Sequence, residues 1–79
     1  MSNKYATFIK STRVARGFSQ SYMAEKLGIS RPSYVGIEQG KREITMGEFE
    51  KLSNVLGVSF EEIESGESPN YEKYKQMIL

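Results

Sequence analysis

The sequence predicts a compact all-α domain of five short helices. Apolar residues recur at helical spacing along the chain, and neither an alternating strand pattern nor an internal repeat occurs. Ser, Thr and Gly stand where such helices would begin and end. The 79 residues suffice for one small domain with a modest core, but are too few for a deep catalytic cleft.

The first two helices are predicted from their apolar faces and their ends. We expect a first helix over residues 4–16, stopping at Gly17. Ser19 is the expected N-cap of a second helix that ends at Gly28. The inner faces of these helices are formed by Tyr5, Phe8, Ile9 and Thr12, and by Met23, Ala24 and Leu27.

A third helix follows in the stretch GISRPSYVGIEQG. Ser30 is its expected N-cap, and Pro32 falls in the first turn, where a missing N–H has no intrahelical partner. Pro32 therefore starts this helix instead of breaking it. Gly40 is the expected stop, and residues 41–44 form a connecting loop.

The fourth and fifth helices are predicted from capping boxes. Thr45 with Glu48, and Ser59 with Glu62, match the pattern in which each member caps the other's backbone. These boxes open a helix ending at Leu56 and a short one ending near residue 64. The inner face of the fourth helix carries Phe49, Leu52, Val55 and Leu56.

The C-terminal residues are predicted to lie apart from this domain. We assign residues 1–66 to the domain and residues 67–79 to a hinge and tail, the hinge composition extending over Ser65–Asn70. The tail YEKYKQMIL is compatible with an extra amphipathic helix bearing Tyr71, Tyr74 and Ile78. Its alternatives are a contact with its own domain, a dimer contact, a partner contact, or the start of a further domain.

Composition excludes several classes of function. Cys, His and Asp are all missing from the chain, so Ser–His and Cys–His nucleophile pairs and the usual zinc ligand sets cannot form. We expect no enzyme, no catalytic residue, no metal and no cofactor. No apolar run approaches a membrane span and no signal peptide is apparent, so a cytoplasmic protein is expected.

The charges are divided unevenly between the two halves of the chain. Residues 1–42 have a net charge of +6 and residues 43–79 a net charge of −5, although the total is only +1. A polyanion can orient a molecule that is basic at one end and acidic at the other. The alternative is chance variation among helix surfaces.

The turn between the second and third helices suggests a DNA-binding motif. Gly28 supplies the positive φ that lets the third helix leave at a steep angle, as in the helix-turn-helix, whose second helix enters the major groove. An ordinary corner between two helices is the alternative.

Five spaced motifs make the comparison specific, and they occur in order along residues 9–63. They are Gly17-Phe18-Ser19-Gln20, Met23-Ala24, Gly28-Ile29-Ser30, Ile37-Glu38-Gln39-Gly40 and Leu56-Gly57-Val58-Ser59. In this register the chain resembles the phage-repressor and Cro-like helix-turn-helix family, also called the xenobiotic-response-element type. The resemblance implies a lambda-repressor-like fold that binds double-stranded DNA.

The resemblance also implies roles for individual residues. Gln20 is expected to contact the DNA backbone and to brace the recognition helix, with Ser19 beside it at the interface; a merely exposed polar residue is the alternative. The recognition helix would present its first residues and one further turn to the bases. These positions are occupied here by Ser30, Arg31, Pro32, Ser33 and Gly36.

The hydrogen-bonding groups of these side chains indicate which part of the DNA each would contact. Arg31 is the expected base reader, because a guanidinium fits O6 and N7 of guanine with two hydrogen bonds; a phosphate contact or a solvated side chain is the alternative. Ser33 would bond a phosphate or a base edge, and Pro32 would offer apolar contact to a thymine methyl. Gly36 departs from the longer polar residue common in the family. It would let the backbone approach either the DNA or the neighbours of Tyr34.

Three further positions are expected near phosphates. Tyr34 should place its ring in the core and its hydroxyl at the edge, within reach of a phosphate. Lys41 and Arg42 follow the recognition helix in a loop where the family often touches phosphates; a solvated loop is the alternative. Beneath this surface the resemblance implies a structural ion pair between Arg13 and Glu38.

The predicted function is a sequence-specific transcriptional regulator, acting as a homodimeric repressor on a palindromic operator. Activation through the acidic fourth and fifth helices is left open. The alternative from another class is an antitoxin-type module that neutralises a partner protein and represses its own operon. A helical domain without a DNA role is the third interpretation.

Overall fold

The computed structural model describes residues 4–65, and in this range the all-α prediction of five helices is confirmed. The helices are α1 (Lys4–Arg16), α2 (Gln20–Leu27), α3 (Arg31–Glu38), α4 (Met46–Leu56) and α5 (Phe60–Ser65). Ser65, predicted as the start of the hinge, is instead the last residue of α5. The remaining hinge and tail predictions lie outside the described residues.

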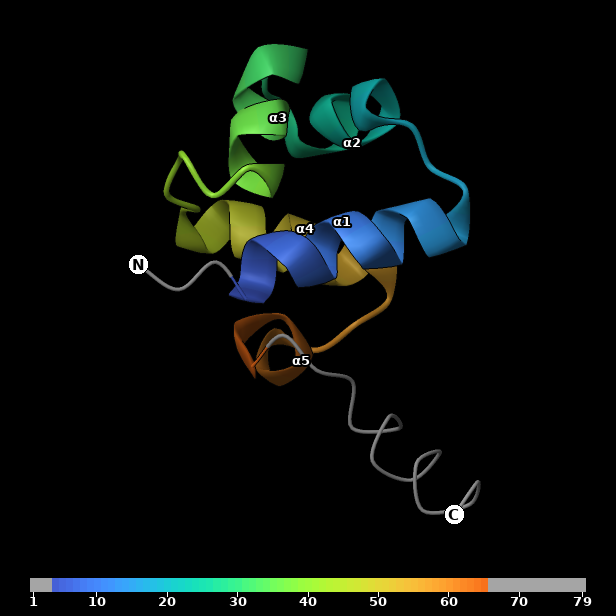
Figure 1. Cartoon of the computed structure of the whole chain (residues 1–79), viewed down its shortest axis with the longest axis vertical. Coiled ribbons are helices and arrows are strands. Elements are labelled where there is room, and N and C mark those ends of the chain that lie inside the picture. The colour runs from blue at the N-terminus through green and yellow to red at the C-terminus, as the bar shows by residue number, and fades with distance from the viewer. Residues whose placement is uncertain (1–3, 66–79) are drawn as a thin grey trace.

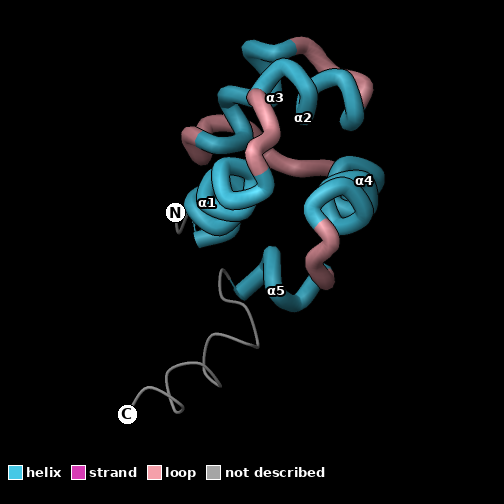
Figure 2. The backbone as a smooth tube through the Cα atoms, turned by 90° about the vertical axis from the view of Figure 1, so that its right-hand side faces the viewer, coloured by secondary structure: helices cyan, strands magenta, loops and turns pink. Residues whose placement is uncertain are grey.

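The helices are stacked in three tiers (Figure 1). α2 and α3 form one end, α1 and α4 the middle, and α5 the other end, and the view turned by 90° shows the same order (Figure 2). α1 packs against α3, α4 and α5, and α2 packs against α3 and α4. None of the described helices is long and apolar enough to cross a membrane.

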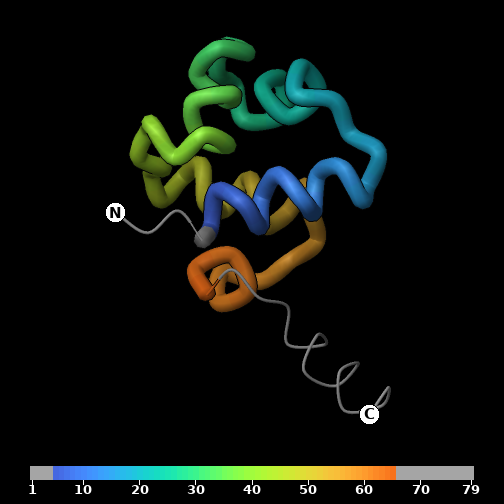
Figure 3. Tube along the Cα trace, viewed as in Figure 1, coloured from blue at the N-terminus to red at the C-terminus, as the bar shows by residue number. Residues whose placement is uncertain are grey.

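The core lies where the tiers meet and draws on every helix. Figure 3 shows that the chain starts in the middle tier with α1, forms α2 and α3 at one end, and returns through α4 in the middle tier to α5 at the other end. Residues distant in sequence therefore meet in the middle tier. The predicted inner residues of α2 are all buried, whereas Tyr5, Phe8, Phe49 and Val55 are only partly buried. The buried cluster consists of Ile9, Met23, Ala24, Leu27, Tyr34, Ile37, Leu52, Leu56 and Ile63.

The predicted helix caps are present. The side chains of Ser19, Ser30 and Thr45 each accept a backbone N–H from the first turn of α2, α3 and α4. Both capping boxes close: Thr45 pairs with Glu48, and the N–H of Ser59 donates to Glu62 at 3.2 Å while the N–H of Glu62 donates back to Ser59 at 3.1 Å. These caps satisfy backbone groups that have no partner inside the helix, and so fix where each helix begins.

The turn between α2 and α3 depends on Gly28. This residue has φ of 71°, in the left-handed region that glycine adopts without steric cost. The following N–H, of Ile29, donates to the carbonyl of Ala24 at 3.0 Å, which closes the end of α2. Ser30 then opens α3 at once, so that α2 and α3 form the helix-turn-helix unit expected from the sequence.

Candidate nucleic-acid interface

The first turn of α3 lies at the surface. Arg31 and Pro32 are exposed and Ser33 is partly buried. Ser30 is also exposed, and its hydroxyl accepts the N–H of Ser33 at 3.2 Å. Arg31 and Pro32 are therefore free to contact another molecule, while the hydroxyl of Ser30 holds the helix start.

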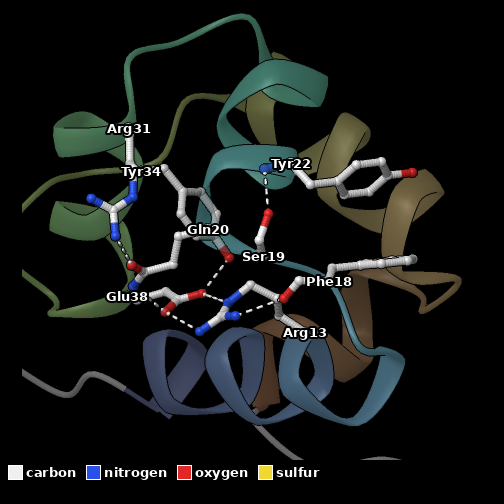
Figure 4. Close-up of polar contacts among 8 residues, drawn as sticks. All are labelled: Arg13, Phe18, Ser19, Gln20, Tyr22, Arg31, Tyr34 and Glu38. Atoms are coloured by element: carbon white, nitrogen blue, oxygen red, sulfur yellow. Dashed lines mark hydrogen bonds and ion pairs between the residues drawn. The ribbon is translucent and has the colours of Figure 1, made fainter.

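Gln20 joins Arg31 to the interior (Figure 4). Nη2 of Arg31 donates to Oε1 of Gln20 at 3.2 Å, and Nε2 of Gln20 donates to Oε1 of Glu38 at 3.2 Å. A carboxylate only accepts hydrogen bonds, so Glu38 forces the amide nitrogen of Gln20 inward and its oxygen toward Arg31. The amide orientation of Gln20 thus places an acceptor where the guanidinium of Arg31 needs one.

Glu38 anchors this chain of contacts in the core. Nε and Nη2 of Arg13 donate to its two carboxylate oxygens at 2.5 and 3.2 Å, and the hydroxyl of Tyr34 donates at 2.5 Å. Arg13 also donates to the carbonyl of Phe18 at 2.7 Å. The ion pair between Arg13 and Glu38 that the resemblance implied is thus present in the structure.

The charge state of Glu38 follows from these contacts. Burial alone would raise its pKa, but the hydrogen bonds from Arg13, Tyr34 and Gln20 outweigh burial and lower the pKa below its ordinary value. Burial, followed by the bond to Glu38, raises the pKa of the Tyr34 hydroxyl. Glu38 is therefore a carboxylate and Tyr34 a hydrogen-bond donor at neutral pH.

The predicted phosphate contact of the Tyr34 hydroxyl is not supported by its position. Its ring lies in the core as predicted, but the residue is 0% exposed and its hydroxyl is bonded to Glu38 instead of lying at the edge. A phosphate cannot reach that hydroxyl without breaking the contact. We therefore remove Tyr34 from the DNA-facing residues.

Arg42 differs from the prediction of a cation in the loop that contacts a phosphate, because it forms an ion pair within the domain. Its Nη1 and Nη2 donate to the two carboxylate oxygens of Glu48 at 2.8 and 2.7 Å, so the guanidinium is held in an ion pair, although 31% of the side chain stays exposed. Lys41, the residue before it, is exposed. Of the two loop cations predicted to contact phosphates, only Lys41 is presented without an ion-pair partner in the described part of the chain.

Gly36 lies on the outward face of α3. At 3.6 residues per turn, Pro32, Gly36 and Gln39 fall within about 60° of one another, opposite Tyr34 and Ile37. A Cβ placed on Gly36 would lie 3.5 Å from Cβ of Arg42, an ordinary van der Waals contact. The Cβ position of Gly36 thus faces the loop after α3.

The structure gives the remaining predicted residues distinct positions. Ser19 is exposed, and its hydroxyl accepts the N–H of Tyr22 at 2.9 Å. Two residues were missed by the sequence analysis. Gln39 is exposed on the same face as Pro32, a position that the helical period alone could have indicated. The role of Glu48 as partner of Arg42 depends on how the loop folds, and no local pattern indicates it.

Comparison with known proteins agrees with this geometry. A helix-turn-helix family model matches residues 9–63. The uncharacterised SPbeta prophage-derived HTH-type transcriptional regulator YonR of Bacillus subtilis is 47% identical over 51 residues, which cover 65% of this chain and 47% of YonR. The uncharacterised HTH-type transcriptional regulator YqaE of the same organism is 40% identical over 60 residues, covering 76% of this chain and 52% of YqaE. The chain therefore spans about half the length of these relatives.

Two solved structures extend the comparison. The N-terminal DNA-binding domain of SinR from Bacillus subtilis has a TM-score of 0.70 at 30% identity, over 78% of this chain and 91% of that domain. SinR in its complex with SinI has a TM-score of 0.68 at 28% identity, over 90% of this chain and 74% of that one. The prediction that the chain is not an enzyme is confirmed, because the family is one of transcriptional regulators. The chain belongs to the phage-repressor-like helix-turn-helix family of DNA-binding proteins.

Proposed function

We propose that this chain is the DNA-binding part of a sequence-specific transcriptional regulator, and that it seats the first turn of α3 in the major groove. The observation that carries the proposal is the link from Arg31 through Gln20 to the buried Glu38. This link orders the guanidinium before DNA arrives, so less side-chain freedom remains to be lost on binding.

The hydrogen bonds of Arg31 leave it able to read a base. A guanidinium has five N–H donors, and the structure uses one nitrogen, Nη2, for Gln20. The remaining donors suffice for the two acceptors of a guanine, O6 and N7. Pro32, exposed beside Arg31, would contact a thymine methyl.

Phosphate contacts are assigned to the rim of this surface. The amide of Gln20 has two N–H groups, one of which donates to Glu38, so the other is available to a phosphate oxygen. The exposed residue Lys41 supplies a positive charge in the loop that follows α3. Ser19 and Ser33 complete the set of polar groups near the DNA backbone.

We further propose that two copies bind a palindromic operator and repress transcription by occluding a promoter. α3 has 8 residues and so is about 12 Å long, enough to read about three to four base pairs. That is too few to define a unique site. Two copies related by a twofold axis, with half-sites about 34 Å apart, would double the sequence that is read.

Selection of bound duplexes from a random pool, followed by a salt titration on the enriched sequence, tests this proposal. We expect an enriched palindrome and an affinity that falls steeply as salt rises, because phosphate contacts release counterions. No enriched sequence together with a salt-independent affinity would contradict it.

A second candidate is a module that binds a protein partner, as an antitoxin does. The solved complex of SinR with SinI favours it, because a structural relative has there been captured with another protein. The apolar residues Met77, Ile78 and Leu79 supply a sequence suited to such a contact. Sedimentation of the chain with and without residues 68–79 separates the cases. Loss of the dimer on truncation would assign the tail to self-association, whereas an unchanged monomer–dimer balance would favour a contact with a partner protein.

A further inference from the structure

The loop between α3 and α4 holds an arginine that a buried carboxylate restrains. Glu48 is 8% exposed, and its carboxylate accepts hydrogen bonds from both terminal nitrogens of Arg42. Nη1 of Arg42 also donates to the carbonyl of Glu43 at 3.1 Å. Oε1 of Glu48 accepts the backbone N–H of Thr45 at 3.0 Å, so the same side chain closes the capping box of α4. Glu48 is thus fixed by α4 and in turn fixes Arg42.

This restrained cation lies beside the proposed DNA-facing surface. Gly36 is on the outward face of α3, and the Cβ of Arg42 is its nearest neighbour across the loop. The N–H of Lys41 donates to the carbonyl of Gly36 at 2.9 Å, so the loop folds back along the C-terminal part of α3. The side chain of Arg42 retains 31% of its exposure, so the guanidinium is near solvent even while it is paired.

We propose that Glu48 lowers the sequence-independent affinity for DNA by withholding the charge of Arg42 from DNA phosphates. The inference rests on the proposed function. Each cation that contacts a phosphate strengthens binding to all sequences alike, whereas base contacts strengthen binding to one. Neutralising Arg42 next to α3 therefore lowers sequence-independent affinity and leaves the contribution of Arg31 unchanged.

Glu48→Gln separates the two duties of Glu48. Glutamine is accepted at this position of a capping box, because its amide oxygen still receives the N–H of Thr45. It cannot form a bidentate ion pair with a guanidinium. The variant therefore frees Arg42 while α4 keeps its cap, and a thermal melt verifies that the variant folds.

The experiment measures affinity for a mixed-sequence duplex of about 20 base pairs, long enough for two half-sites one turn apart, over a range of salt. We expect Glu48→Gln to bind this duplex more tightly at low salt and to steepen the slope of log K against log salt by about 0.9, the value of one phosphate contact. That change corresponds to a loss of affinity about three- to fourfold larger between 50 and 200 mM salt.

Two comparisons distinguish this effect from a general change of charge. Glu50→Gln removes the same charge from an exposed position on α4 and should leave the slope near that of the parent. Arg42→Gln should leave the slope unchanged when Glu48 is present. In the Glu48→Gln background it should make the slope less steep by about 0.9. The combined variant therefore returns to the parental slope.

Two outcomes overturn the inference. An unchanged slope in Glu48→Gln shows that the freed Arg42 does not reach a phosphate. A less steep slope in Arg42→Gln alone shows that Arg42 contacts a phosphate even when Glu48 is present. Failure of the proposed function looks different, because the unmodified chain would then show no salt-dependent binding to any duplex.

Discussion

Glu38 accepts hydrogen bonds from three side chains that three different helices supply. Arg13 comes from α1, Gln20 from α2 and Tyr34 from α3. Removal of one partner of a buried ion pair leaves the other charge uncompensated, and this cost exceeds the net contribution of the intact pair. At the residue scale, this carboxylate connects the stability of the fold to the position of Arg31.

Glu38→Ala should therefore lower the free energy of unfolding by about 3–5 kcal/mol, because Arg13 and the hydroxyl of Tyr34 lose their acceptor. Urea denaturation measures the effect. Glu25→Ala, at an exposed position on α2, is the matched control and should change stability by about 0.5 kcal/mol or less. A Glu38→Ala variant as stable as the parent but unable to bind DNA would show that Glu38 acts at the interface instead.

The two structural carboxylates predict how stability depends on pH. Hydrogen bonds from Arg42 lower the pKa of Glu48 from 4.5 to about 2, and the pKa of Glu38 is lowered as well. A carboxyl whose pKa is lower in the folded state contributes stability above its unfolded pKa and loses it as pH falls. We expect the free energy of unfolding to decline between about pH 4.5 and pH 2.

Chemical denaturation at several pH values tests this expectation. The decline should be smaller in Glu48→Gln, which has no carboxyl to protonate at this position, and unchanged in Glu50→Gln. Parallel declines in the parent and Glu48→Gln would show that the contact with Arg42 does not control acid stability.

Helix boundaries were predictable because their determinants are local. Ser19, Ser30 and Thr45 each accept an N–H within three residues along the chain, and the sequence contains both partners. The pairing of Arg42 with Glu48 spans a loop whose conformation depends on the packing of α3 and α4, so the sequence indicated only the capping role of Glu48. The contact between Tyr34 and Glu38 is intermediate, because four residues on one helix bring side chains together.

α3 carries a glycine whose replacement should stabilise it. Gly36→Ala should raise the free energy of unfolding by about 0.5–1 kcal/mol, because alanine loses less backbone freedom on forming a helix. Its new Cβ would make only an ordinary contact with Arg42. Thermal and urea denaturation measure the change, and destabilisation would show that the loop after α3 cannot accommodate a methyl group.

Gly28→Ala is the contrasting variant. Gly28 has φ of +71°, where a side chain costs about 1–2 kcal/mol, so this substitution should destabilise the domain by about that amount.

The DNA affinity of Gly36→Ala adds a second readout. If the Gly36→Ala variant is more stable than the parent yet binds DNA more weakly, the close approach at Gly36 serves the interface and not the fold.

The whole molecule separates its charges along the stack of helices. α3 with Arg31 and the loop with Lys41 lie toward one end, and α5 with its glutamates lies at the other (Figure 1). The uneven charge of the sequence indicated this polarity, but overstated the cations available to DNA. Arg13 and Arg42 are paired with glutamates, and Arg16 donates to the carbonyl of Leu56 at 2.9 Å.

The cations that remain should therefore contribute unequally to binding. Lys41→Gln should make the slope of log K against log salt less steep by about 0.9, because one phosphate contact is lost. Lys26→Gln is the control, because the Lys26 ammonium lies 5.4 Å from the ring of Tyr22, and that ring points away from Arg31 (Figure 4). Equal effects of the two variants would show that overall charge, and not position, determines the salt dependence.

The central claim is that α3 places Arg31 against a guanine in the major groove. The direct measurement is the affinity of the parent and of Arg31→Ala for the enriched duplex and for duplexes in which each base pair of the site is replaced in turn. We expect Arg31→Ala to lose about 1–3 kcal/mol on the enriched duplex and almost nothing once one particular G·C pair has been replaced. An equal loss on every duplex would contradict the claim, because Arg31 would then contact only the backbone.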